Sequence, residues 1–373
     1  MVQSAAAPAP DARNRGDRRV IIYWSMYLVP ALLTLNQTFS HRRIPIGSYW
    51  LLFALLMVLV GLRETGGDYP TYKVMFQIIA GSTFADALKV SDPGYVLVNW
   101  VSNQLHFGMY GVNTVCGLTY FYGFYRFARR EPEPILMLTI SIAYQVIVTV
   151  MGYTRQGAAV GLLMWGIPYL YERKPVRFLV FSLLAASFHS SAIVFMPLAY
   201  FGFNWRTQRL ASFFAVVGLA LAVYLGYRTL HDRFSSFYDN YIESKHYSSQ
   251  GALIRSSMTA LAAAMFLGHW RRWGRAWNDR RIWLAFALAA LAMVPLTFTA
   301  STAADRIGLY LIPLQLVVFA RLPALQRTRG QHDVWVMAIL AGYAASLGVW
   351  LYFGQFTSVL WLPYKSLILG EVR

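Results

Sequence analysis

The sequence predicts an all-α fold, a polytopic bundle of about 12 or 13 transmembrane helices. Of the 373 residues, 57% are hydrophobic and only 13% are charged, and the mean hydropathy is +0.43. An average soluble domain is roughly 45–50% apolar and about 25% charged. Apolar runs of bilayer length recur along nearly the whole chain. Open sheets are excluded inside lipid, because the bilayer offers the backbone no hydrogen-bond partners.

The expected spans follow one another along the chain. They lie near 20–37, 48–62, 109–127, 135–152, 156–171, 176–188, 190–203, 210–227, 251–268, 282–299, 307–320 and 334–352. A shorter apolar run, 93–107, is either a further span or a re-entrant segment. We therefore expect a single integral membrane domain over 20–373.

The first 19 residues predict a basic, disordered cytoplasmic tail, because Arg13, Arg15, Arg18 and Arg19 stand there among alanines and prolines. No small-residue cleavage site follows the first apolar run, so we expect that run to stay as a signal anchor.

The net charge of +17 comes from 33 basic and 16 acidic residues. In a polar protein this excess suggests a nucleic-acid partner, but here the basic residues flank apolar runs and we expect none. From residue 109 onward the basic clusters fall in alternate loops: Arg126, Arg129 and Arg130; Arg173, Lys174 and Arg177; Arg206 and Arg209; Arg271, Arg272, Arg275, Arg280 and Arg281; Arg321, Arg327 and Arg329. The positive-inside rule makes these loops cytoplasmic and the loops between them outward-facing.

The first third of the chain allows two topologies. If the basic tail is inside and every run spans, residues 63–92 lie in the cytoplasm. If His41, Arg42 and Arg43 are inside, residues 63–92 lie outside and 93–107 is re-entrant.

Several kinds of chemistry have no sequence signal. Cys116 is the single cysteine, so no internal disulfide and no cysteine-based metal cluster can form. The nucleotide-binding, zinc-protease and serine-hydrolase motifs are absent, and no cofactor or metal is expected. The polar segments are too short to bury a soluble catalytic domain. Any chemistry is therefore expected at the membrane surface.

The first polar group follows the second predicted span and runs from Arg63 to Tyr72. Gly66 and Gly67 permit a tight turn there, and Asp68 can cap the helix that begins at Tyr69 or Pro70. Tyr69 and Tyr72 share a helix face. The alternative is an interfacial turn in which the arginine snorkels and the tyrosines join the aromatic belt.

The second polar group is Tyr153, Thr154, Arg155 and Gln156, between two spans. An arginine in the first turn of a helix opposes the helix dipole. An anionic ligand would explain that placement, because a helix N-terminus and a guanidinium together make a phosphate site. The alternative is a snorkelling arginine with a carboxylate neighbour.

The third polar group is His189 with Ser190 and Ser191, inside an apolar run. A lone histidine there is either an interhelical hydrogen-bonding residue or a catalytic residue. No second histidine or cysteine stands at metal-ligand spacing.

The fourth polar group is Asp305 and Arg306 with Tyr310. Arg306 is expected at the start of an outward-facing helix, as Arg155 is, and Arg255 repeats this placement one turn into another span. The alternative is that adjacent acidic and basic residues offset each other. Together the three arginines predict an electropositive pocket open to the outside.

The loop 228–250 carries aromatic residues at spacings of three and four, including Tyr238 and Tyr241, which predict an amphipathic interfacial helix. Its rings are either sugar-stacking surfaces or part of an aromatic belt.

With these residues in order, the sequence resembles the EpsG family of exopolysaccharide polymerases, relatives of Wzy-type O-antigen polymerases. The matching pieces are Arg63 with Gly67-Asp68-Tyr69-x-x-Tyr72, Asp92-Pro93-Gly94-Tyr95, Arg155-Gln156, Phe188-His189-Ser190-Ser191-Ala192, Asp305-Arg306 with Tyr310, and Trp361-Leu362-Pro363-Tyr364. They cover about residues 50 to 365. Asp92 departs from the family, which commonly has glutamate there.

The resemblance implies a metal-independent, GT-C-like glycosyltransferase in the bacterial inner membrane. It would join undecaprenyl-diphosphate-linked oligosaccharide repeat units at the periplasmic face, with a chain-length-determining co-polymerase and a flippase as partners. Arg155, Arg255 and Arg306, supported by Arg63, would stabilise the leaving diphosphate. His189 or Asp68 would accept the proton of the attacking hydroxyl.

The resemblance also favours the topology with 63–92 outside, because the site would otherwise be split. The candidate glycan contacts are Tyr69, Tyr72, Tyr153, Gln156, Tyr238, Tyr241 and Tyr310.

Three alternatives stay open on the sequence. One is an O-antigen ligase-like transferase. Another is a transporter of polysaccharide or lipid-linked sugar, although the polar residues stand at helix ends and no internal repeat is present. The third is a membrane acyltransferase that uses His189.

Overall fold

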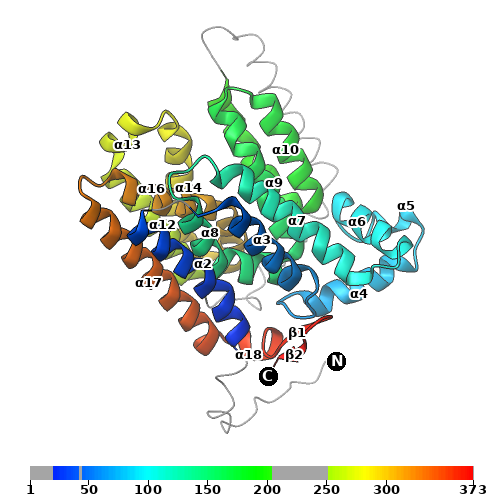
Figure 1. The fold of residues 1–373 in the computed structure, drawn as a ribbon. Helices are drawn as coiled ribbons and strands as arrows, with labels where there is room; N and C mark the ends of the chain where they lie inside the picture. The colour runs from blue at the N-terminus through cyan, green and yellow to red at the C-terminus, as the bar shows by residue number, and fades with distance from the viewer. Residues whose placement is uncertain (1–19, 42–43, 204–250, 373) are drawn as a thin grey trace.

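The computed structural model describes residues 20–41, 44–203 and 251–372. Within these ranges the chain is almost wholly helical, which confirms the all-α bundle (Figure 1). The predicted tail over 1–19, the predicted span 210–227 and the loop with Tyr238 and Tyr241 lie outside the described residues.

The described part before residue 204 is a series of short and medium helices, among which η1 is a π-helix and η2 a 3₁₀-helix. They are α2 (Ile21–Ser40), α3 (Ile46–Gly61), α4 (Tyr69–Ala80), α5 (Phe84–Ala87), α6 (Pro93–Gln104), α7 (Gly108–Ala128), α8 (Pro134–Ser141), η1 (Ile142–Val150), α9 (Thr154–Tyr171), α10 (Pro175–Phe188) and η2 (Ser190–Gly202). Proline stands in the first two positions of α4, α6, α8 and α10, where its fixed φ favours a helix start.

The part after residue 250 contains longer helices and a small hairpin. They are α12 (Ala252–Gly268), α13 (Trp270–Ala276), α14 (Arg280–Thr299), α15 (Ser301–Gly308), η4 (Leu309–Leu311), α16 (Ile312–Arg321), η5 (Pro323–Leu325), α17 (Arg329–Phe353), α18 (Thr357–Leu360), β1 (Tyr364–Ser366) and β2 (Gly370–Val372). The antiparallel pair β1 and β2 is not among the elements expected from the sequence.

Three helical runs in the described residues are long and apolar enough to cross a membrane: Arg280–Thr299, Ser301–Arg321 and Arg329–Phe353. Shorter apolar helices accompany them, among them Pro134–Val150 and Ala252–Gly268. The 12 residues of α6 extend only about 18 Å, less than the roughly 30 Å hydrocarbon core. Its length therefore favours the re-entrant alternative for 93–107.

Helices α9 and α16 form the centre of the bundle. Most residues of α9 and all residues of α16 are buried. Small residues let α9 approach α7 closely, because Gly123 of α7 lies directly against the backbone of Gly161. Arg155 stands at the start of α9, and Arg306 leads into α16, so the rigid centre positions both.

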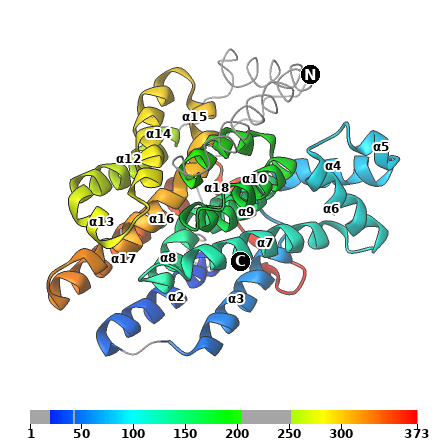
Figure 2. The ribbon, with the colours of Figure 1, turned by 90° about the horizontal axis from the view of Figure 1, so that it is seen from above.

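A lateral lobe of α4, α5 and α6 projects from the bundle beside α7 in both ribbon views (Figures 1 and 2). The lobe has its own small apolar clusters, one of which contains Tyr72 and Tyr95. This lobe carries the segment 68–92 toward the start of α9.

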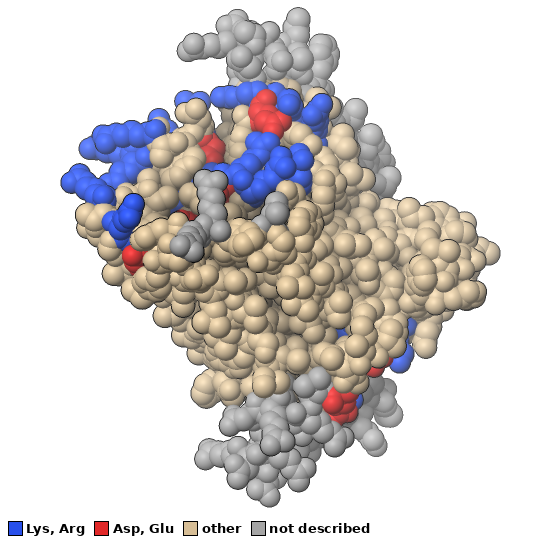
Figure 3. Space-filling view, viewed as in Figure 1, with Lys and Arg blue, Asp and Glu red and all other residues tan. Residues whose placement is uncertain are grey.

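The two ends of the bundle differ in charge. Lys and Arg gather over the end that contains α13, whereas the middle of the visible face is an uncharged belt (Figure 3). Arg177, Arg272 and Arg281, from three of the predicted cytoplasmic clusters, are exposed. The hairpin of β1 and β2 lies at the opposite end (Figure 1).

Candidate functional site

Asp68 lies in a tight loop between α3 and α4. Gly66 has a φ of +142° and touches the backbone of Met151, so a side chain at this position would clash. The backbone N–H of Asp68 donates to Gly152 O at 2.9 Å. These contacts fix the loop against the turn that precedes α9.

The side chain of Asp68 does not cap α4, which corrects the expectation that it would. Its Oδ2 instead lies 3.9 Å from Nη2 of Arg306. Partial burial of Asp68, whose side chain is 34% exposed, raises its pKa and outweighs the opposing effect of the guanidiniums of Arg306 and Arg155. The carboxylate therefore has a higher proton affinity than an exposed aspartate.

Arg155 lies in the first turn of α9, as predicted, and faces the lateral lobe. Its Nη1 donates to Ser91 Oγ at 2.8 Å and lies 3.3 Å from Asp92 Oδ2. The guanidinium carbon is 5.7 Å from the ring centroids of both Tyr72 and Tyr95. Cation–π contacts and one ion pair thus orient the arginine.

Arg306 does not begin a helix, contrary to the expectation, because it lies in the last turn of α15. Its guanidinium carbon is 4.1 Å from the ring centroid of Tyr153. Its backbone oxygen accepts a hydrogen bond from Gln156 Nε2 at 2.6 Å. The helix-dipole argument therefore applies to Arg155 and not to Arg306, which is positioned by Tyr153 and Gln156.

His189 occupies the break between α10 and η2. Its Nδ1 lies 2.7 Å from Ser191 Oγ, which donates to the Tyr310 hydroxyl at 3.0 Å. Burial, together with the positive charges of Arg155 and Arg306, lowers the pKa of His189 to about 3. The imidazole is therefore neutral at neutral pH and a weak proton acceptor.

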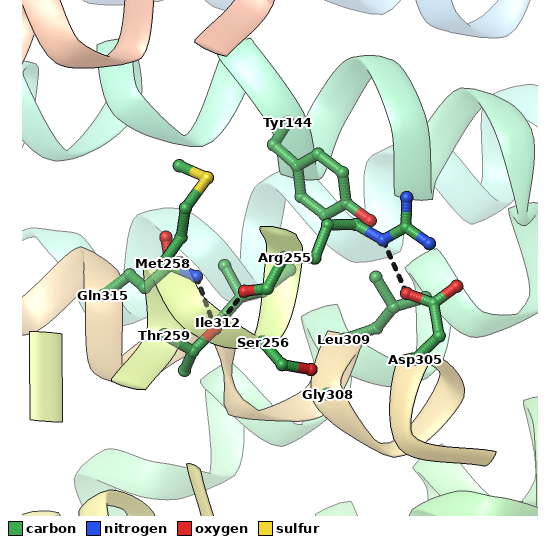
Figure 4. A pocket seen from close by; sticks show the side chains of 10 residues that line it. All are labelled: Tyr144, Arg255, Ser256, Met258, Thr259, Asp305, Gly308, Leu309, Ile312 and Gln315. Carbon is green, nitrogen blue, oxygen red and sulfur yellow. Dashed lines mark hydrogen bonds and ion pairs between the residues drawn. The ribbon is translucent and has the colours of Figure 1, made fainter. Parts of the chain in front are cut away.

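Arg255 lies in the first turn of α12 and points at Asp305 of α15 (Figure 4). Its Nε donates to Asp305 Oδ1 at 2.6 Å, and its guanidinium carbon is 6.0 Å from the ring centroid of Tyr144. A buried polar chain continues behind it, because Gln315 Nε2 donates to Thr259 Oγ1 at 2.7 Å. This chain fixes α12 to α16.

Each of the three arginines has an aspartate partner: Arg155 with Asp92, Arg255 with Asp305, and Arg306 with Asp68. This pairing corrects the expectation of a simply electropositive pocket, because the three pairs are formally neutral. Among them the pair of Arg306 and Asp68 has the longest separation, 3.9 Å, against 2.6 and 3.3 Å for the other two.

Arg63 is fully buried. Its Nε donates to Met151 O at 3.1 Å, and its Nη2 donates to Val150 O at 3.2 Å and to Thr154 Oγ1 at 2.7 Å. These acceptors belong to the end of η1 and the start of α9, where a cation complements the helix C-terminus. Direct contact with a diphosphate, as expected from the sequence, disagrees with this position.

The candidate glycan contacts divide by exposure. Tyr72, Tyr310 and Gln156 are buried and are not available for contact with a sugar in this conformation, which corrects the expectation for these three. Tyr69 and Tyr153 are partly exposed.

The C-terminal segment braces the Asp68 loop, which the sequence reasoning did not foresee. Leu360 O accepts from Gly66 N at 3.0 Å, and Ser366 forms a β-bridge with Arg63. A Cβ added at Gly67 or Gly152 would lie 2.6 or 2.8 Å from the ring of Trp361. Trp361 therefore packs directly on Gly67, which precedes Asp68, and on Gly152, which accepts its backbone hydrogen bond. The sequence signals for this contact are the glycines and the motif Trp361-Leu362-Pro363-Tyr364.

Within the described ranges, no three residues of the His, Cys, Asp and Glu types come together in a way that could hold a metal ion.

The model of the EpsG family matches residues 48–366. The chain belongs to the EpsG family. The EpsG match extends from α3 to β1 and includes all the polar segments described above. EpsG is a Wzy-type polymerase-like family, so this EpsG protein has a polysaccharide-polymerase type of function and resides in a membrane.

Comparisons with curated proteins and with solved structures gave no match.

Proposed function

We propose that this EpsG protein joins undecaprenyl-diphosphate-linked oligosaccharide repeat units at the periplasmic face of the bacterial inner membrane. The observation that carries the proposal is the meeting of Asp68 and Arg306 beside Arg155, because it places a carboxylate of raised pKa next to cationic groups. The three residues come from separate segments of the chain that the fold brings together. Family membership supplies the polysaccharide context.

In the proposed reaction, a sugar hydroxyl of one repeat unit attacks the anomeric carbon of the sugar that is bound to the lipid diphosphate of another chain. A new C–O glycosidic bond forms, and the bond from that carbon to the diphosphate oxygen breaks. The electron pair leaves with the diphosphate, and the hydroxyl proton passes to the carboxylate of Asp68. The products are a longer lipid-linked glycan and a free lipid diphosphate.

Asp68 is a better candidate base than His189. A general base is most effective when its pKa lies near the working pH. Burial moves the pKa of Asp68 upward from its ordinary value, whereas the pKa of His189 is lowered to about 3. His189 is assigned instead to a neutral hydrogen-bonding role with Ser191.

Arg306 and Arg155 are assigned to binding the leaving diphosphate. Arg255, the partner of Asp305, is assigned to the same diphosphate. Fixed guanidiniums stabilise negative charge that grows as the glycosidic bond breaks. Protonation of Asp68 during the reaction removes one negative charge beside Arg306, so that guanidinium binds the diphosphate more strongly as the charge develops.

Arg63 is assigned a positioning role rather than a diphosphate contact. It holds the end of η1 to the start of α9, and therefore sets the position of Tyr153 and Arg155.

The proposed topology puts residues 63–92 on the periplasmic side, and the basic tail with them, because two predicted spans separate the tail from residue 63. It is supported by the contacts of Asp68 and Asp92 with Arg306 and Arg155, because contacting residues share one face of the membrane. The exposed basic end around α13 is then cytoplasmic.

The test is an assay of the purified full-length protein with undecaprenyl-diphosphate-linked repeat units in lipid nanodiscs. A ladder of longer glycans is expected for the unaltered protein, and Asp68→Asn and Arg306→Ala should each reduce it by roughly a hundredfold or more. Arg272→Ala, at an exposed position on the basic end, is the matched control and should leave the ladder intact.

No ladder with the unaltered protein would refute the polymerase assignment. Transfer of a repeat unit to lipid A without a ladder would support the ligase alternative instead. An undiminished ladder for both site variants would refute the assignment of residues.

A further inference from the structure

A large cavity lies between α12 and α17, beside the candidate site. Its volume is about 840 Å³, within the range typical of ligand pockets. The walls come from Ile254, Leu261 and Met265 on α12 and from Trp335, Ala345 and Phe353 on α17. The proposed reaction centre does not include these residues.

Among the described residues, charge along this cavity is found at one end. Arg255 is the one charged side chain among the described residues that line it. Tyr153, which also lines the cavity, carries the guanidinium of Arg306 on its ring at 4.1 Å. The cationic end of the cavity is therefore continuous with the candidate site.

Most of the other described residues that line the cavity are apolar, and Ser346, Gln355 and Thr357 are polar exceptions. From Arg255 to Met265 the cavity follows α12 for about 15 Å at 1.5 Å per residue. The walls at the far end are formed by Met265, Phe319 and Trp335. Met258 and Met265 are flexible side chains that adapt to irregular apolar partners.

We propose that this cavity holds the isoprenoid chain of a lipid diphosphate substrate, with the diphosphate at Arg255. The inference rests on the proposed function and adds the binding site of the lipid portion. One cationic end and a long apolar wall match a ligand that has an anionic head and a single apolar chain. The isoprenoid chain extends into the cavity from the end at Arg255, so that the reacting sugar remains beside Asp68 and Arg306.

Two substitutions on α17 distinguish the effect of filling the cavity from the effect of placing a large side chain on that helix. Ala345 lines the cavity and Ala341 does not, although both are alanines on exposed faces of α17. Ala345→Trp should fill the cavity, and Ala341→Trp is the matched control. Gly342 also lines the cavity and has no atom within 4 Å of an added Cβ, so Gly342→Leu is a second filling variant.

The first experiment measures binding without catalysis. A diazirine-bearing undecaprenyl diphosphate without sugars is photo-crosslinked to the full-length protein in nanodiscs, and labelled peptides are identified by mass spectrometry. Labels are expected on α12 and α17. Ala345→Trp and Gly342→Leu should reduce them about tenfold, and Ala341→Trp should not.

Competition identifies the ligand class. Unlabelled undecaprenyl diphosphate should displace the probe, whereas phosphatidylglycerol should not. Arg255→Gln should weaken displacement by undecaprenyl diphosphate but not by the uncharged polyprenol. Equal displacement by phosphatidylglycerol, labels elsewhere, or equal effects of Ala345→Trp and Ala341→Trp would overturn the proposal.

The second experiment compares polymerisation of repeat units on undecaprenyl diphosphate with polymerisation on a diphosphate that carries only two isoprene units. Ala345→Trp should reduce the first reaction about tenfold and the second little. Specific labelling without any glycan ladder would leave the cavity assignment in place and refute the proposed function. A normal ladder from Ala345→Trp on the long lipid would refute the cavity assignment alone.

Discussion

Arg306 and Arg321 lie near opposite ends of the same helical run, Ser301–Arg321, yet their surroundings differ sharply. The side chain of Arg321 is 3% exposed, and its guanidinium makes hydrogen bonds of 2.6 to 3.0 Å with both Glu131 and Asp279. It also lies 4.8 Å and 4.5 Å from the ring centroids of Trp273 and Trp277. This end of the run is closed.

The side chain of Arg306 is 23% exposed, and its aspartate partner is 3.9 Å away. The ring of Tyr153 contacts its guanidinium, and the large cavity begins beside that ring. This end of the run is accessible.

The comparison separates two uses of arginine in one membrane protein. A buried guanidinium saturated by carboxylates stabilises the packing of the loops that supply them, because removal would leave buried charges without a partner. A partly exposed guanidinium held by aromatic contacts can change its anionic partner without unfolding the protein. The four predictions below test this distinction, from the largest expected effect to the smallest.

The first prediction compares removal of the arginine at each end of the run. Arg321→Ala leaves Glu131 and Asp279 buried without their cation, and should cost about 3–5 kcal/mol of stability. Arg306→Ala should change stability little while it reduces polymerisation by roughly a hundredfold. The thermal unfolding midpoint in detergent and the glycan ladder measure the two effects. Equal loss of stability in both variants would contradict the comparison.

The second prediction concerns pH and the open end. The ordinary pKa of aspartate is 3.8, and burial raises that of Asp68. Since the base must be deprotonated, polymerisation should fall as the pH decreases through this raised pKa. Arg306→Gln removes a charge that lowers the pKa of Asp68, so the acid limb should move to higher pH.

The measurement for this second prediction is kcat/KM against pH for the unaltered protein and for Arg306→Gln, with Arg272→Ala as control. An acid limb that stays in place in Arg306→Gln would show that Asp68 is not the titrating group.

The third prediction tests the contact of Trp361 with the Asp68 loop. A methyl group at Gly67 would lie 2.6 Å from the ring of Trp361, so Gly67→Ala should displace the Asp68 loop and reduce kcat about tenfold. Trp361→Phe removes the distal ring and should partly restore the rate in the double variant. Gly330→Ala is the control, because its added Cβ meets no atom within 4 Å. Additive losses in the double variant would contradict the contact.

The smallest effect is expected at His189. Because His189 is neutral and bonds with Ser191, glutamine can reproduce its hydrogen bond, and His189→Gln should reduce kcat less than about fivefold. A loss of a hundredfold or more in the ladder assay would instead assign the base to His189.

The sequence was informative where a property is local. Hydropathy predicted the helical bundle, and the first-turn position of Arg155 followed from the polar residues between two apolar runs. The re-entrant alternative for 93–107 was available from the length of its apolar run. The sequence did not predict the position of Arg306 at the end of a short helix, because the hydropathy pattern does not show that α15 begins at Ser301, directly after α14 ends at Thr299.

The sequence could not predict which carboxylate each arginine meets. Asp68 was expected to cap α4 by local chemistry, but the loop geometry at Gly66 and the approach of α15 direct it to Arg306. The burial of Arg63 could not be predicted either, because it depends on carbonyl groups at the end of η1, far along the chain. The resemblance alone therefore assigned Arg63 to the site.

The sequence by itself determined the helical bundle, the basic clusters in alternate loops and the family, because hydrophobicity, charge and motif order are properties of the chain. The tertiary structure decided the pairing of Arg306 with Asp68, the burial of Arg63, the support from Trp361 and the cavity between α12 and α17. These features depend on contacts between residues far apart in the chain. Helix packing, including close approaches at glycines, decides which residues meet.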